Sequence, residues 1–276
     1  MSRKRVVIVR NPAKHEAQAT LASLEECFAR HAEVTATGVI ADAPGLLAGE
    51  PDRVVVLGGD GSILAVARGL GPREVPVVGV NFGKLGYLAE FGLEDVNRHV
   101  EAILHDDALI SRRMMIHAAI RGPAGTVMDS PAVNDCVVHA GPPFRMIELS
   151  IRVDEEEITT VAGDGLVLST PTGSTAHNMS AGGPIVQSEV SAIVLTPLTP
   201  HSLTHRPVVV AGSSTISVLA REVNAGTTVA IDGQLSAPLR TGDELHIRRH
   251  VRDFLLVHNP SRTAWHTLTT KLRWGR

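Results

Sequence analysis

Short valine-rich runs that alternate with helical patterns most limit how the first hundred residues can fold. The three clearest runs are 5–9 (RVVIV), 53–57 (RVVVL) and 75–80 (VPVVGV). They lack the polar alternation of a half-exposed strand, as is typical of strands buried on both faces. Residues 14–30 and 63–70 predict helices between them, and residues 33–37 predict a further strand. Strands separated by helices form parallel sheets with right-handed crossovers, so we predict an α/β N-terminal domain over residues 1–108.

The pattern changes after residue 108, where short strand-like segments are joined by turns that contain Gly, Asp, Asn or Pro. These segments are 113–120, 132–139, 146–153, 165–168, 192–195, 207–210, 215–219, 227–231, 244–247 and 254–257. They predict a β-rich, antiparallel, layered or sandwich-like domain over residues 109–260. Residues 261–276 form a C-terminal tail, which we expect either to pack back on the first domain as a helix or to stay loose.

The composition excludes several classes of partner. Lys plus Arg number 26 and Asp plus Glu 29, so the basic stripe of a nucleic-acid-binding protein is not expected. Aromatic residues make up only 3%, too few for a surface that stacks single-stranded bases. No run approaches the roughly 18 apolar residues of a membrane span, and two cysteines suit a reducing compartment. We therefore predict a soluble, cytoplasmic protein with no nucleic-acid or membrane partner.

The segment GGDGS directly follows the predicted strand 53–57 and precedes the predicted helix 63–70. Ligands of open α/β sheets bind at this edge, and glycines let a backbone approach a phosphate closely. We predict a phosphate loop made of Gly58, Gly59, Gly61 and Ser62. Asp60 would repel a phosphate unless it served a metal or accepted a proton from a hydroxyl group. The alternative is a tight turn with a solvent-facing Asp60, and the spacing matches neither a Rossmann nor a Walker A motif.

A second polar feature is the pair Asn134 and Asp135, which interrupts the strand-like run 132–139. A buried polar pair costs stability unless it is hydrogen-bonded, and a ligand hydroxyl or base edge can supply the partner. A β-bulge or turn with self-satisfied side chains is the structural alternative.

A third feature is the segment 164–184, which holds five hydroxyl residues between positions 169 and 175 and ends in glycines. Small hydroxyl and glycine residues can wrap a polar, phosphorylated ligand. We also predict that Ser174 or Thr175 caps a short helix that ends near Gly182 and Gly183. A Ser/Thr-rich loop before a capped helix, without any ligand, would show the same pattern.

In this order, GGDGS, Asn134-Asp135 and GDGLVLSTPTGSTAHNMSAGGPIV resemble the motifs of the NAD kinase family. The resemblance also includes residues 79–88 (GVNFGKLGYL) and 231–234 (IDGQ), and it spans roughly residues 55–235. GGDG alone is also found in diacylglycerol kinases, sphingosine kinases and 6-phosphofructokinases. The long TPTGSTA and SAGGP segment is far more specific.

The resemblance implies an NAD kinase, which transfers the γ-phosphoryl group of ATP to the 2′-hydroxyl of the adenosine ribose of NAD to give NADP. ATP or inorganic polyphosphate would be the donor, with Mg²⁺ or another divalent metal accompanying ATP. Residues 109–260 would be the dinucleotide-binding domain, with NAD in the cleft between the domains. The family also implies a homodimer or homotetramer.

The resemblance assigns roles to individual residues of this chain. Asp60 matches the proton acceptor, which also contacts NAD, and Gly61 belongs to the same loop. Asn134 and Asp135 match a pair that contacts the adenosine part. The other positions that match NAD contacts are Arg145, Ala162, Asp164, Thr175, Ala176, His177, Asn178, Met179, Ser180 and Gln234. Two of these residues depart from the family pattern, because Asp135 stands where many members have Glu and His177 where Tyr is usual.

Two other functions stay open at this point. One is a lipid kinase of the diacylglycerol or sphingosine type, and the other is a dinucleotide-sensing regulator without turnover. The intact Asp60 argues against the regulator. No metal ligand is predicted, because the histidine pairs with i, i+4 spacing lack the cysteine or H-E-x-x-H context of a zinc site.

Overall fold

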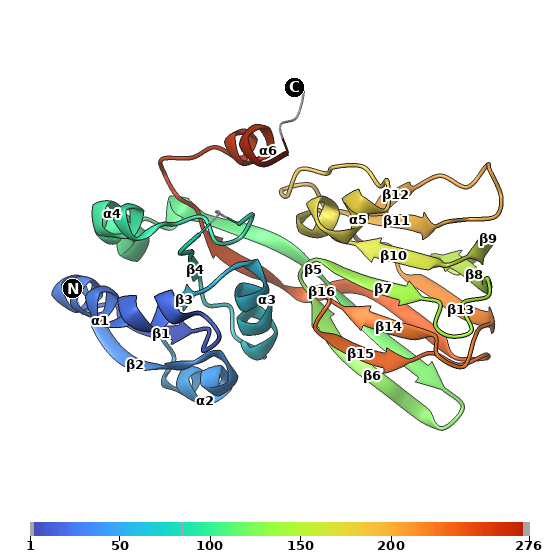
Figure 1. Cartoon of the computed structure of the whole chain (residues 1–276), viewed down its shortest axis with the longest axis horizontal. Helices are drawn as coiled ribbons and strands as arrows, with labels where there is room; N and C mark the ends of the chain where they lie inside the picture. Colours follow the sequence, from blue (N-terminus) through green and yellow to red (C-terminus); the bar gives the residue numbers. More distant parts are fainter. Residues whose placement is uncertain (1–2, 84–85, 273–276) are drawn as a thin grey trace. The chain divides into compact units, whose positions relative to one another are not determined.

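The structure is a computed structural model that describes residues 3–83 and 86–272, and it divides into two compact units. Unit 1 comprises Met1–Arg112 and Phe254–Arg276, and unit 2 comprises Arg113–Asp253. The chain passes between the units twice, within strands β5 (Ile110–Gly122) and β16 (Glu244–Val257) (Figure 1). Among the described residues, no helix has the length and hydrophobicity needed to cross a bilayer.

A parallel sheet forms the centre of unit 1, as the alternating pattern predicted. Its strands, in the order β2-β1-β3-β4, are β2 (Glu33–Val39), β1 (Arg5–Arg10), β3 (Arg53–Leu57) and β4 (Val77–Val80). The end of β16 continues the sheet, with Leu256 beside Val77 in parallel register. The valines of β1 and β3 are fully buried because helices cover both faces.

Helices α1 (His15–His31) and α4 (Leu93–His105) pack against each other, whereas α3 (Asp60–Gly69) packs on β3, β4 and the short helix α2 (Ala43–Leu46). A last helix, α6, spans Ala264–Leu272. Helix α4 was not predicted from the sequence. The sequence does contain the pattern of a helix there, because the apolar residues that α4 buries recur at helical spacing: Val96, Val100, Ile103 and Leu104.

Two antiparallel sheets form unit 2, which confirms the predicted sandwich-like domain. One follows the order β12-β11-β10-β7-β14-β15. Its strands are β7 (Asp135–His139), β10 (Gly165–Ser169), β11 (Ala192–Leu198), β12 (Val208–Ala211), β14 (Thr228–Ile231) and β15 (Leu235–Pro238). The other contains β5, β16, β6 (Gly125–Ala132), β8 (Ile147–Val153), β9 (Glu156–Gly163) and β13 (Ile216–Glu222). Val138 and Leu168 of one sheet and Val218 of the other share one buried core.

The predicted strand 132–139 is two strands. β6 ends at Ala132 and β7 begins at Asp135. The backbone N–H groups of Val133 and Asn134 donate to a side-chain carboxylate rather than to a neighbouring strand, so the ladder is interrupted at this point.

Two other predictions are wrong in their boundaries. The segments predicted as separate strands, 244–247 and 254–257, belong to one strand, β16. The polar stretch between them is largely exposed and contains no Gly or Pro to turn the chain. The helix predicted over 63–70 begins earlier, at Asp60, because the Gly59 carbonyl accepts the first N–H bonds of the helix.

Candidate functional site

In unit 1, the GGDGS segment places Asp60 in the first turn of α3, directly after β3. The Gly58 N–H donates to the carbonyl of Val80 in β4 at 2.9 Å. A Cβ at Gly58 would overlap the hydroxyl of Ser62, so only glycine allows this close approach of loop and helix. The buried Ser62 hydroxyl accepts a hydrogen bond from Nδ2 of Asn11 at 3.0 Å. Ser62 therefore anchors the loop within unit 1.

The Asp60 carboxylate is held by backbone N–H groups of the segment that follows β4. Oδ2 accepts from Tyr87 at 2.9 Å, and Oδ1 accepts from Leu88 and Ala89 at 3.0 Å each. Gly86 lies so close that a Cβ there would overlap Oδ1 and lie 2.6 Å from Cγ. These contacts hold the carboxylate, which is half-buried, in one orientation.

In unit 2, the Asn134-Asp135 pair lies at the start of β7 beside the β14–β15 turn. The Asp232 carboxylate accepts three backbone N–H bonds, from Val133 at 3.1 Å, Asn134 at 2.8 Å and Asp135 at 3.2 Å. Within the described part of the chain, the side-chain amide of Asn134 forms no hydrogen bond with another residue. The backbone of this pair is therefore fixed while the Asn134 amide stays available to a ligand.

Asp135 has an environment that favours its neutral form. Burial and, to a smaller extent, the nearby charge of Asp232 together raise the pKa of this carboxyl to about 7, and a hydrogen bond from the backbone of His177 partly opposes this rise. The adjacent Cys136 is fully buried and the pKa of its thiol is raised well above its usual value by burial, which fits a packing role.

The segment 169–175 lies directly against the Asn134 backbone. The Thr170 N–H donates to the Asn134 carbonyl at 2.8 Å, and the Thr170 hydroxyl donates to the Val133 carbonyl at 2.6 Å. A Cβ at Gly173 would overlap the Asn134 carbonyl oxygen. The Asn134-Asp135 pair and the Ser/Thr-rich segment, which are separate features in the sequence, therefore pack together in the fold.

The predicted capping of a helix by Ser174 or Thr175 is wrong. The short helix α5 (His177–Ser180) has no side-chain cap. The buried Ser174 hydroxyl instead donates to the Pro171 carbonyl at 2.6 Å and accepts the Val186 N–H at 3.0 Å. A capping residue has an extended backbone, whereas Ser174 and Thr175 lie in a 3₁₀ turn that precedes the helix. The Ser174 oxygen therefore closes the loop instead of capping the helix.

Asn178 is placed differently from the other predicted contact residues. Its side chain is fully buried. Nδ2 donates to the carbonyls of Ser174 at 3.2 Å and Pro184 at 2.9 Å, and Oδ1 accepts from the Thr196 hydroxyl at 2.7 Å. With these groups bonded internally, the Asn178 side chain is suited to hold the loop in shape, and the contact with NAD that the resemblance implied stays a prediction.

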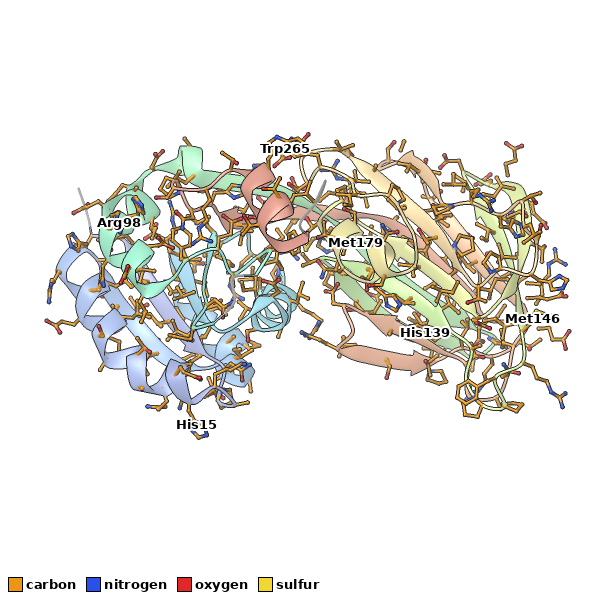
Figure 2. All side chains as sticks on the ribbon, turned by 45° about the horizontal axis from the view of Figure 1, so that its top comes forward. His15, Arg98, His139, Met146, Met179 and Trp265 are labelled. Atoms are coloured by element: carbon orange, nitrogen blue, oxygen red, sulfur yellow. The ribbon has the colours of Figure 1, made fainter. Side chains whose placement is uncertain are left out.

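The remaining predicted residues of unit 2 lie toward one or the other end of β7. Gln234 follows the turn near Asn134, whereas Asp164 precedes the residue that pairs with His139. His177 links the two ends, since its backbone bonds Asp135 and its ring centroid lies 5.2 Å from that of His139, the residue labelled in Figure 2. Exposed side chains are Arg145, Asp164, Ser180 and Gln234, and half-buried ones are Ala162, Thr175, Ala176, His177 and Met179.

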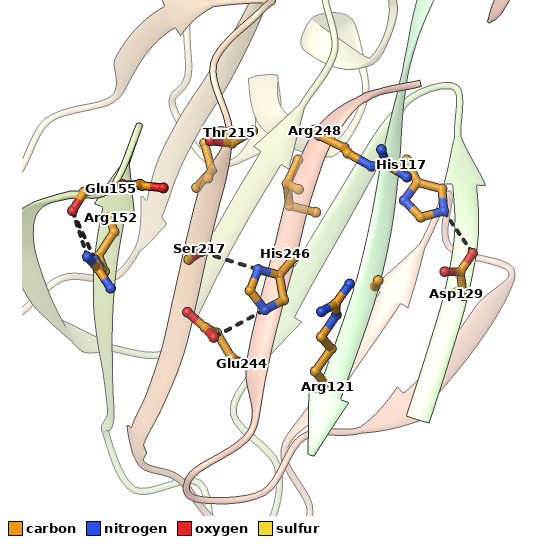
Figure 3. A pocket seen from close by; sticks show the side chains of 13 residues that line it. His117, Arg121, Asp129, Arg152, Glu155, Thr215, Ser217, Glu244, His246 and Arg248 are labelled. Atoms are coloured by element: carbon orange, nitrogen blue, oxygen red, sulfur yellow. Dashed lines mark hydrogen bonds and ion pairs between the residues drawn. The ribbon is translucent and has the colours of Figure 1, made fainter. Parts of the chain in front are cut away.

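A separate hollow of about 690 Å³ lies beside strands β5, β13 and β16 of unit 2 (Figure 3). Nε2 of His246 lies 3.1 Å from a carboxylate oxygen of Glu244 inside it, and His117 bonds Asp129 at 2.7 Å. Of the predicted site residues that the structure describes, none lines this hollow.

The sequence did not predict Asp232, Gly86 or the backbone N–H groups of residues 87–89 as parts of the candidate site. Asp232 and Gly86 lie in the runs 231–234 and 79–88, which resemble motifs of a known family. Their position in these two runs was the available signal, but it did not show which atoms of Asp232 and Gly86 make contacts or which residues they contact.

The raised pKa of Asp135 predicts a pH-dependent stability difference between the wild type and the Asp135→Asn variant. Between pH 4 and 7 the unfolded chain ionises Asp135 while the folded chain keeps it protonated, so rising pH favours unfolding. We expect the wild type to lose on the order of 1 kcal/mol per pH unit relative to the variant across this window. Urea unfolding at pH 5 and pH 7 measures this difference, and all other titrating groups are shared by both proteins. A difference that stays constant with pH contradicts the prediction.

Profiles of known families match most of the chain. The ATP-NAD kinase N-terminal domain matches residues 4–108, and the ATP-NAD kinase C-terminal domain matches residues 133–259. An NAD kinase from Geotalea daltonii is 38% identical over 252 residues, which cover 91% of this chain and 87% of that protein. An NAD kinase from Rhodopirellula baltica is 34% identical over 276 residues, covering 98% of this chain and 87% of that protein.

Solved structures show the same fold. An NAD kinase from Archaeoglobus fulgidus in complex with ATP has a TM-score of 0.78 and 25% identity, and 98% of each chain is covered. Yeast NADH kinase complexed with NADH has a TM-score of 0.87 and 24% identity, with 100% of this chain and 89% of that chain covered.

Proposed function

The chain belongs to the ATP-NAD kinase family and catalyses phosphoryl transfer from ATP to NAD, and from this premise we propose that Asp60 accepts the proton released in the reaction. The 2′-oxygen of the adenosine ribose forms a bond to the γ-phosphorus as the bond from that phosphorus to the β,γ-bridging oxygen breaks, so the products are NADP and ADP. The observation that carries the proposal is the fixed orientation of the Asp60 carboxylate by three backbone N–H groups.

Hydrogen bonds from residues that the structure describes use three lone-pair sites of this carboxylate and leave one for a proton. An ionised carboxylate has about four lone-pair sites. Leu88 and Ala89 use both sites on Oδ1, and Tyr87 uses one on Oδ2. The second site on Oδ2 is the one that would accept the ribose proton as the hydroxyl attacks phosphorus.

The loop before α3 is suited to the phosphate groups of the substrates. Gly59 is half-buried and Gly61 is exposed, and a Cβ at Gly59 would meet no atom within 4 Å. The helix start carries no side-chain cap. Backbone N–H groups at such a helix start favour negative charge, so alignment of the phosphates is the main contribution we assign to this loop.

In unit 2, we assign adenosine recognition to Asn134 and Asp135. The amide of Asn134 offers two donors and an acceptor, which suits a base edge or a ribose hydroxyl. A carboxyl with a pKa of about 7, such as that of Asp135, can donate or accept near neutral pH. The other contacts assigned to NAD are Arg145, Ala162, Asp164, Thr175, Ala176, His177, Met179, Ser180 and Gln234.

Mg²⁺ enters this proposal as part of the nucleotide substrate. In the part of the chain that the structure describes, no three His, Cys, Asp or Glu side chains gather as a metal site. Phosphate oxygens are ligands that Mg²⁺ prefers, so the ion would be held mainly by ATP. No protein residue is assigned to it.

We assign the protein to the cytoplasm, where its free cysteines, Cys27 and Cys136, would stay reduced.

The activity is tested by incubating the purified protein with NAD, ATP and Mg²⁺ and detecting NADP. Inorganic polyphosphate in place of ATP tests the second donor. Absence of NADP with both donors contradicts the proposed reaction.

We also expect a homodimer or homotetramer. Phe144 and Met146, which flank the exposed Arg145, are 73% and 55% exposed, and Met146 lies at the periphery of unit 2 (Figure 2). Apolar side chains beside an arginine are typical of protein interfaces. Light scattering at micromolar concentration should give the mass of two or four chains, and Phe144→Ser should lower it. The mass of a single wild-type chain contradicts the expectation.

A further inference from the structure

We propose that Asp232 is a positioning residue for NAD, because its carboxylate fixes the backbone from which the Asn134 amide projects. The three N–H groups that it accepts belong to consecutive residues, Val133, Asn134 and Asp135. The N–H of Asp232 in turn donates to the Asp135 carbonyl at 2.9 Å. Hydrogen bonds to an ionised carboxylate are about twice as strong as neutral ones.

The carbonyl groups of the same stretch are held independently. Thr170 bonds the carbonyls of Val133 and Asn134, and the Ser169 hydroxyl adds a bond to the Asn134 carbonyl at 3.3 Å. Asp232 thus holds the N–H groups of residues 133–135, while Ser169 and Thr170 hold carbonyl groups of the same stretch. Loss of Asp232 would free the N–H groups and leave the bonds to the carbonyl groups in place.

Burial makes the contact costly to break. Asp232 is 8% exposed and Asp135 is 4% exposed, so water has little access to replace the lost bonds. Released N–H groups would move toward other acceptors, and the Asn134 amide would move with them. A displacement of about 1 Å takes a side-chain amide out of hydrogen-bond distance of a ligand that it would otherwise bind.

The turn that carries Asp232 allows two informative substitutions. Asp232 and Gly233 have φ values of 50° and 64°, which are those of a type I′ hairpin turn. Asn and Gly both tolerate this conformation, so Asp232→Asn and Asp232→Gly preserve the hairpin. Glycine removes all three bonds, whereas asparagine keeps one acceptor oxygen and removes the charge.

The inference rests on the proposed role of Asn134 in binding adenosine, so the experiment includes Asn134→Ala. Calorimetric titration with NAD gives the Kd of each variant, and steady-state assays give KM and kcat for NAD and ATP. We expect Asp232→Gly to raise the Kd and KM for NAD by about 10- to 100-fold, and Asp232→Asn by about threefold. The kcat at saturating NAD and the KM for ATP should stay within about twofold, since only NAD binding is lost.

The matched control is Ser236→Ala on the same hairpin, an exposed side chain, which should retain wild-type values. If both Asp232 variants bind NAD within twofold of wild type while Asn134→Ala is weakened, the positioning role is wrong and the proposed site stands. If Asn134→Ala itself binds normally, the proposed adenosine contact is wrong. An equal loss of affinity for ATP and NAD indicates general damage and overturns the inference. Should Asp232→Gly not fold, Asp232→Asn decides alone.

Discussion

The Asp60→Asn variant is expected to lose about 10²- to 10⁴-fold in kcat, the range that general-base catalysis contributes. Asparagine presents one oxygen where the carboxylate presents two, and its Nδ2 cannot accept the ribose proton. Binding of NAD should change much less, because the residues assigned to adenosine lie in unit 2. NADP formation under saturating substrates measures kcat, and calorimetry measures the Kd for NAD.

The matched control is Asp42→Asn, an exposed aspartate of unit 1 outside the GGDGS loop, which should retain wild-type turnover. Thermal unfolding of Asp60→Asn shows whether the segment 87–89 is still held. A folded Asp60→Asn protein with near-normal kcat would remove Asp60 from the role of proton acceptor.

Gly86→Ala is expected to lower kcat/KM on the order of 10²-fold by displacing the Asp60 carboxylate. The added Cβ would overlap Oδ1 and lie 2.9 Å from Oδ2, so the carboxylate or the segment 86–89 must shift. Either shift would break the proposed alignment of Oδ2 with the ribose hydroxyl. Steady-state NADP formation measures the effect.

Gly45→Ala serves as its control, because a Cβ there meets no atom within 4 Å and the residue lies in helix α2. It should leave kcat/KM unchanged. Wild-type kinetics for Gly86→Ala would show that the carboxylate contact with residues 87–89 is not needed for turnover.

Most of the fold of unit 1 was predictable because its signal is local. The runs at 5–9 and 53–57 became β1 and β3, since strands buried on both faces must be apolar throughout. The helix α4 shows that a local signal can still be missed. β16 could not be recognised as one strand from its two apolar ends, because its exposed middle resembles a loop in composition.

The residue types at the candidate site were predictable, but the contacts that orient them were not. Asp232 lies 98 positions from Asn134, and Tyr87 lies 27 positions from Asp60. A hydrogen bond from a backbone N–H uses an atom that nearly every residue carries, so it leaves no trace in the side-chain pattern. For the same reason, nothing in the sequence distinguished Asn178, whose amide bonds the loop and Thr196 of β11, from Asn134, whose amide forms no bond with another described residue.

By itself, the sequence determined the two kinds of sheet, the family and the order of its polar motifs, because burial and turn formation act on neighbouring residues. Only the tertiary structure decided which oxygen of Asp60 accepts two backbone hydrogen bonds and which accepts one, and which carboxylate holds the Asn134 backbone. Those outcomes depend on chain segments that meet only after folding, when each buried polar group must find a partner.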